Sequence, residues 1–175
     1  MNRMNIKKYL LILTGVMLLG GCGNSTPANT VSTEPIATTQ ETVEANESKA
    51  ITEIYDEITQ NVTLYSPFCW DDEFISNYYG IDVTSLEEYV FSMSEDATSA
   101  ETIIIMKAKD SSSVSGLSDC LQVVVDEKKN EMENYLPEQF EIVEKSSVQT
   151  KDNYVWLVIS ENADAITKII EDSIS

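Results

Sequence analysis

Hydrophobic residues recur at helical spacing near both ends of the segment that follows residue 50. Apolar positions three and four residues apart form one side of an amphipathic helix. The first such set is Ile51, Ile54, Tyr55, Ile58 and Val62. The second set is Ala163, Ile166, Ile169, Ile170 and Ile174, with Ser160 before it as the expected N-cap. The pattern therefore predicts a helix at each end of this segment.

A third helical pattern is longer and spans residues 113–136. Its apolar positions are Val114, Leu117, Leu121, Val124, Val125, Met132 and Tyr135, with Asp, Glu and Lys between them. This spacing predicts one long helix with a charged outer side. Pro137 has no N–H to donate, so it either stops this helix or starts a brief new one.

Denser apolar runs predict the strands. Residues 89–93 and 102–109 read as two of them, and the run Ile103–Met106 suggests burial on both faces of a sheet. Residues 148–150 and 154–159 read as a hairpin closed by Lys151, Asp152 and Asn153, with 154–159 as a central strand. A hairpin implies an antiparallel or mixed sheet.

Short helices are expected between the first helix and the first strand. An aromatic loop over 65–70 leads to Asp71, an expected N-cap flanked by Trp70 and Ile75 as a hydrophobic staple, and this helix should end at Gly80. Thr84 and Glu87 read as a capping box of another short helix or turn. The fold class predicted is α+β: a sheet of about four strands with helices packed on one face, preceded by N-terminal helices.

The first 49 residues read as a targeting segment and a tether. Arg3, Lys7 and Lys8 precede an apolar run over 9–19, which is the order of a signal peptide over residues 1–21. The string Leu19-Gly20-Gly21-Cys22 resembles the bacterial lipobox, whose cysteine is lipidated. The alternative is an uncleaved membrane anchor with a chance cysteine. Residues 22–49 are rich in Thr, Ser, Asn and Glu, which predicts a disordered tether. The single acidic domain is then 50–175, on the extracytoplasmic face of the bacterial cell membrane.

Charge and composition exclude several classes of function. The chain has 175 residues, 30 acidic against 11 basic side chains, a net charge of −19 and no histidine. Nucleic-acid binding is excluded because it needs clustered Lys and Arg. Catalytic mechanisms that need histidine, and histidine-ligated zinc, are excluded as well. No glycine-rich phosphate loop and no calcium-binding D-x-[DN]-x-[DN]-G loop occurs, so we expect no cofactor and no bound metal.

Four segments resemble a known family of lipoproteins from Gram-positive anaerobes. They are Asn77-Tyr78-Tyr79-Gly80-Ile81, Leu86-Glu87-Glu88-Tyr89, Tyr135-Leu136-Pro137-Glu138-Gln139-Phe140 and Asn153-Tyr154-Val155. The family is that of the domain of unknown function DUF4358, and the resemblance covers about residues 50–172. It implies an extracytoplasmic lipoprotein and the order of elements given above, and it carries over no ligand and no catalytic residue.

Side chains with chemical potential are few once the acids are set aside. Cys69 and Cys120 form either a disulfide or, as we expect, two free thiols. Gly116-Leu117-Ser118-Asp119-Cys120 lacks the final glycine of a serine-nucleophile turn. Adjacent acids could host a glycosidase acid/base pair or calcium, but so acidic a chain favours a solvated surface instead. These acids are Asp71-Asp72-Glu73, Glu87-Glu88, Glu95-Asp96, Asp126-Glu127 and Glu171-Asp172.

An aromatic group beside carboxylates is the candidate ligand site. It comprises Tyr65, Phe68, Trp70, Tyr78 and Tyr79 with Asp71, Asp72 and Glu73. Such rings can stack on a sugar or hold a cation, although aromatics more often supply core area. The ligand-binding candidates are Trp70, Asp71, Tyr78 and Tyr79.

The hypothesis for function is a non-catalytic lipoprotein that binds an envelope protein, a peptide or a glycan while its lipid holds it to the membrane. The first alternative is an enzyme that hydrolyses glycans with two carboxylates, for which a raised carboxyl pKa in a cleft would speak. The second is a small-solute-binding lipoprotein that serves a transporter. A single domain of this size lacks the two lobes usual for that task.

Overall fold

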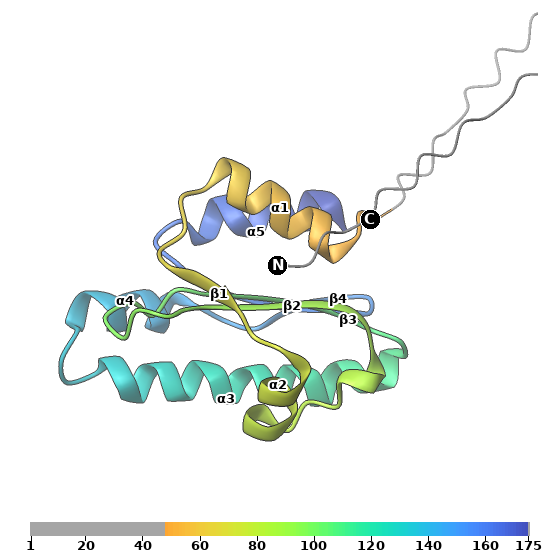
Figure 1. Cartoon of the computed structure of the whole chain (residues 1–175), viewed down its shortest axis with the longest axis horizontal. Helices are drawn as coiled ribbons and strands as arrows, with labels where there is room; N and C mark the ends of the chain where they lie inside the picture. Colours follow the sequence, from red (N-terminus) through yellow and green to blue (C-terminus); the bar gives the residue numbers. More distant parts are fainter. Residues whose placement is uncertain (1–47, 175) are drawn as a thin grey trace, which may run out of the picture. The chain divides into compact units, whose positions relative to one another are not determined.

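The computed structural model describes residues 48–174, which form a five-stranded antiparallel sheet between helices (Figure 1). The strands lie in the order β1-β2-β3-β5-β4. They are β1 (Pro67–Cys69), β2 (Leu86–Ser94), β3 (Thr102–Ala108), β4 (Gln149–Lys151) and β5 (Tyr154–Ile159). The α-helices are α1 (Ile51–Asn61), α2 (Asp72–Tyr79), α3 (Val114–Met132), α4 (Pro137–Lys145) and α5 (Ala163–Ser173). The predicted α+β class is confirmed.

Helices cover both faces of the sheet, whereas the sequence pattern predicted helices on one. In Figure 1, α1 and α5 lie on one side of the strands, and α2 and α3 lie on the other. Alternate residues of β3 explain this arrangement, because Ile103 and Ile105 pack with α1 and α5 while Ile104 and Met106 pack with α3. All four are buried, so each face of the strand needs a cover. The expected burial of this run on both faces is confirmed.

Two local predictions near the first strands are wrong. The aromatic loop contains β1, which pairs with the far end of β2 and brings the sheet to five strands rather than about four. Thr84 and Glu87 do not form a capping box. Asp82 instead accepts hydrogen bonds from the Thr84 amide (2.9 Å) and hydroxyl (2.7 Å), which closes a 3-10 turn over Val83–Ser85. Glu87 lies in strand β2.

The long helix ends four residues earlier than predicted. α3 stops at Met132, whose carbonyl accepts hydrogen bonds from the Tyr135 and Leu136 amides. Pro137 then begins α4 at its first position, where the missing N–H costs nothing. The second of the two outcomes expected at Pro137 is therefore confirmed, and α4 runs for nine residues.

The predicted ends of α2 and the predicted hairpin turn are confirmed, whereas Asn162 rather than Ser160 occupies the N-cap of α5, and Ser160 accepts a hydrogen bond from the Asn162 amide (3.1 Å) before the helix begins. Asp71 accepts a hydrogen bond from the Phe74 amide (3.0 Å) at the start of α2, and Gly80 ends that helix with a φ of 64°. Asp152 and Asn153 join β4 to β5, and Asp152 adopts a φ of 52°. Residues 1–47 are outside the described part, and so are the predicted signal peptide, Cys22 and most of the tether. No helix within 48–174 is both long and apolar enough to cross a membrane.

Candidate functional site

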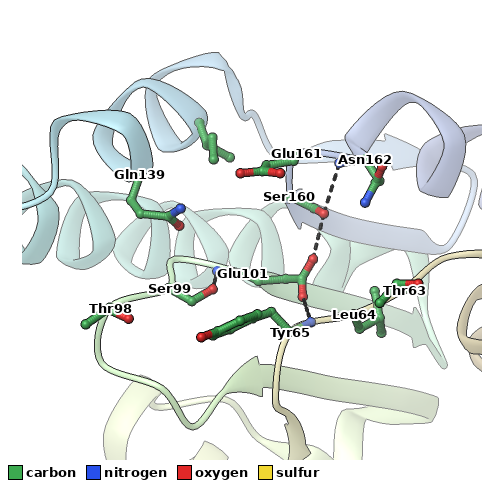
Figure 2. A pocket seen from close by; sticks show the side chains of 11 residues that line it. Thr63, Leu64, Tyr65, Thr98, Ser99, Glu101, Gln139, Ser160, Glu161 and Asn162 are labelled. Carbon is green, nitrogen blue, oxygen red and sulfur yellow. Dashed lines mark hydrogen bonds between the residues drawn. The ribbon is translucent and has the colours of Figure 1, made fainter.

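A polar pocket lies at one end of the sheet, where four segments distant in sequence meet (Figure 2). Its volume is about 350 Å³, within the range of small-ligand sites. Its walls come from the α1–β1 connection, the β2–β3 connection, one side of α4 and the β5–α5 connection. The side chain of Glu101 points into the middle of this group in Figure 2. We call it the Glu101 pocket.

Glu101 is held from two sides. The Ser160 hydroxyl donates a hydrogen bond to one carboxylate oxygen (2.7 Å), and the backbone N–H of Tyr65 donates to the other. The carboxylate thus ties the start of β3 to the chain after α1 and to the chain after β5. Each oxygen keeps lone pairs beyond the bond it accepts, because a carboxylate has about four acceptor sites. Glu101 is partly exposed, so these sites are open to a ligand.

Neighbouring polar groups fix the rim of the pocket. Asp96 accepts hydrogen bonds from the Thr98 amide (2.8 Å) and hydroxyl (2.7 Å), which holds the β2–β3 connection and lowers the pKa of Asp96. The same carboxylate hydrogen-bonds the Tyr65 hydroxyl and raises the pKa of Tyr65. Gln139 of α4 accepts a hydrogen bond from the Ala100 amide (2.8 Å). The ligand face of the pocket is therefore set before any ligand arrives.

The lining predicts the kind of group that fits. Two carboxylates, Glu101 and Glu161, line the pocket together with hydroxyl and amide side chains, and no Lys or Arg lines it. An ammonium group would find acceptors at Glu101 and Ser160, and its charge would match the carboxylates. Leu64 and Ile142 add apolar wall on either side. Within residues 48–174 no three His, Cys, Asp or Glu side chains gather as a metal would require.

The aromatic candidates from the sequence lie together, at α2. Trp70 stacks on Phe74 (centroids 3.9 Å apart), and Phe74 stacks on Tyr78 (4.9 Å). Tyr79 stacks on the core residue Phe91 (5.3 Å), and burial raises its pKa. The rings therefore cover one another's faces, and none of the four candidates lines the Glu101 pocket. Their role in ligand binding stays a prediction.

The two cysteines lie on opposite sides of the sheet and are free. Cys69 pairs with Ser92 across β1 and β2 and lies beside Tyr55 of α1. Cys120 of α3 packs against the hydrophobic core between α3 and the sheet, and burial raises the pKa of its thiol. The sheet separates the two thiols, which confirms the expectation of free thiols.

Several of the adjacent acids hydrogen-bond or pair with other residues. Asp72 accepts a hydrogen bond from the Tyr89 hydroxyl, and Glu88 accepts one from the Ile51 amide (2.7 Å). Glu87 pairs with Lys107 (3.1 Å), and Asp172 pairs with Lys168 (2.7 Å). Asp126 accepts a hydrogen bond from Gln122 (3.0 Å). Glu88 thus accepts the first N–H of α1, while Asp72 and Glu87 contact residues of β2 and β3. Asp126 and Asp172 form exposed pairs within their own helices.

Sequence reasoning did not find the Glu101 pocket. Glu101 is one of 30 acids, and its partners Tyr65 and Ser160 are 36 and 59 residues away in the chain. The one local signal was an acidic residue placed directly before the buried strand β3. An acid at that position needs a partner or an outlet to water, because burial of an unpaired charge is costly.

Comparison with known proteins identifies the family. No curated protein and no solved structure matches the chain. The profile of the domain of unknown function DUF4358 matches residues 60–160, which is more than half of the 175 residues. The matched range holds all five strands and Tyr65, Glu101, Gln139 and Ser160 of the pocket. The chain therefore belongs to the DUF4358 family.

Proposed function

We propose that this protein is a lipid-anchored binding module on the extracytoplasmic face of the membrane, and that its Glu101 pocket holds a ligand through a positively charged amine. The observation that carries the ligand proposal is the carboxylate of Glu101, which the Ser160 hydroxyl and the Tyr65 amide hold in place. It lies in a pocket whose other lining residues are uncharged, apart from Glu161. The anchor proposal rests on the lipobox at Cys22. A flexible tether of about 27 residues would give the domain a reach of roughly 30 Å from the lipid.

Binding is favoured over glycan hydrolysis by what the acidic side chains do. Hydrolysis by two carboxylates needs a general acid with a raised pKa. The pKa values of Asp82, Asp96 and Asp110 are lowered instead, each through hydrogen bonds with the residues of its own turn. Those side chains serve as loop caps. The Glu101 side chain likewise accepts two hydrogen bonds, from the Ser160 hydroxyl and the Tyr65 amide.

The ligand proposal is tested with the smallest probe that carries the amine. Alanine methylamide should bind the full chain in calorimetry or NMR titration, and N-acetylalanine methylamide should not. A charge-assisted hydrogen bond contributes about 1.5–3 kcal/mol, so Glu101→Gln should weaken binding at least tenfold. Glu144→Gln is the matched control, because Glu144 is exposed on α4 and lines neither the pocket nor its rim. Equal binding by the two variants would refute the ligand proposal.

The anchor proposal has a separate test. Cys22→Ala should release the protein from the membrane fraction of the native host, or leave it unprocessed, because the thioether to lipid cannot form. Cys69→Ala is the matched control and should leave fractionation unchanged. Unaltered membrane association of the Cys22→Ala chain, with normal processing, would contradict lipidation.

A further inference from the structure

The edge of strand β5 is open beyond Trp156, where its pairing with the first residue of β4 stops. The pairing of β4 with β5 stops at Gln149 opposite Trp156. On the other side of β5, the Ala108 amide donates to the Asn153 carbonyl, so the odd-numbered residues of β5 direct their backbone groups toward β3. Val158 therefore directs its N–H and C=O toward the open edge. Within residues 48–174, no hydrogen bond reaches the backbone of Val158 from that side.

A groove of about 720 Å³ lies beside this edge, under α5 and next to Ser146 and Ser147. Val158 and Trp156 line it. The side chain of Trp156 is only 3% exposed, and its indole N–H finds no hydrogen-bond partner among residues 48–174. A buried donor without a partner is unusual in a folded protein. The groove also shares Ile142, Ser160 and Glu161 with the Glu101 pocket.

We propose that an extended peptide binds in this groove as an added strand antiparallel to β5, with its N-terminal ammonium in the Glu101 pocket. This inference rests on the proposed function of that pocket and names its ligand class. Strand addition uses the backbone N–H and C=O of Val158, which face the open edge. The shared residues place the groove directly beside the Glu101 pocket.

The geometry of β5 and the charges of the pocket select the same orientation. An antiparallel peptide runs in the direction of β4, so its N-terminal end lies toward Ser160 and the Glu101 pocket. A parallel peptide would place its C-terminal carboxylate beside Glu101 and Glu161, where like charges repel. The antiparallel peptide instead brings an ammonium to these carboxylates.

The charges along the groove favour a neutral or basic peptide. Glu161, Asp164, Glu171 and Asp172 line it, against Lys145 and Lys168. Lys168 is already paired with Asp172 (2.7 Å), and Lys145 lies 4.0 Å from Glu141. The groove therefore keeps an excess of unpaired carboxylates, which opposes an acidic peptide.

The test uses tetra-alanine amide, its N-acetylated form and two N-methylated forms, all titrated into the full chain by NMR. The free amine should bind at least tenfold more tightly than the acetylated peptide, and Glu101→Gln should remove that difference. Backbone N-methylation should weaken binding strongly at the second or the third residue but not at both, because alternate amides of a strand face its partner. The Val158 amide should exchange more slowly when peptide is bound, while Leu157 and Ile159, which face β3, should not change.

Each other outcome is decisive. Equal loss from both N-methylated peptides, or unchanged exchange at Val158, would overturn strand addition. A preference for the acetylated peptide would overturn the orientation. If alanine methylamide binds at Glu101 and tetra-alanine amide binds no more tightly, the peptide inference fails and the proposed function stands. If neither probe binds, both fail.

Discussion

Replacement of Glu101 by alanine should destabilise the domain by about 2 kcal/mol. The change removes the acceptor of the Ser160 hydroxyl and of the Tyr65 N–H, so the α1–β1 and β5–α5 connections lose their common tie. A hydrogen bond to a charged group contributes about 1.5–3 kcal/mol when buried. Glu101 is partly exposed, and water replaces part of each bond, which brings the sum of two bonds down to about 2 kcal/mol. The melting temperature should fall by about 8 °C.

Glutamine at the same position separates the hydrogen bonds from the charge. Its carbonyl can accept from the Tyr65 N–H while its amide donates to the Ser160 oxygen, so Glu101→Gln should cost less than about 1 kcal/mol. Urea unfolding followed by circular dichroism measures both variants, and Glu144→Ala serves as the exposed control, expected within about 0.5 kcal/mol of wild type. The reasoning is refuted if Glu101→Ala also stays within that margin, or if the glutamine variant loses as much as the alanine variant.

Three further predictions follow from contacts elsewhere in the domain. Asp71→Ala should cost about 1 kcal/mol in urea unfolding through loss of the cap on α2, whereas Asp71→Asn should cost much less; equal effects would contradict the cap. Burial raises the pKa of Tyr55 and Tyr89 from 10.0 to about 12, so both are held neutral in the fold. The stability that the two neutral tyrosines contribute is complete below pH 10.0 and is lost as pH rises toward about 12. The free energy of unfolding of Tyr55→Phe should therefore fall less steeply at alkaline pH than that of the wild type. With Cys22 replaced by alanine, the folded chain should react with a thiol reagent quickly at exposed Cys69 and slowly at Cys120; a chain with no free thiol would contradict their separation.

Much of the fold could be predicted because its elements carry local patterns. The helical spacing from Ile51 to Val62 and the strand predicted over 102–109 locate α1 and β3 to within one residue. Asp71 and Gly80 bound α2 through interactions with their immediate neighbours. Such signals survive in the sequence because caps and amphipathic faces depend on residues only a few positions apart.

The parts that escaped prediction depend on partners far away in the chain. β1 is three exposed residues that include Pro67, so it has neither apolar alternation nor helical spacing, and only its pairing with Met93 and Ser92 makes it a strand. The Ile103–Met106 run indicated burial on both faces, yet helices were predicted on one face only, because the sequence does not show which side of the sheet α1 and α5 cover. The Glu101 pocket depends on contacts between connections 36 and 59 residues apart, for which the sequence carries no periodic signal.

The most direct test of the account is a crystal structure of the chain with tetra-alanine amide. The account predicts the peptide ammonium about 2.8 Å from a carboxylate oxygen of Glu101. It also predicts backbone hydrogen bonds from the peptide to Val158. Density for the peptide at the Trp70–Phe74–Tyr78 rings, with the Glu101 pocket empty, would contradict it and would return the binding role to the aromatic residues.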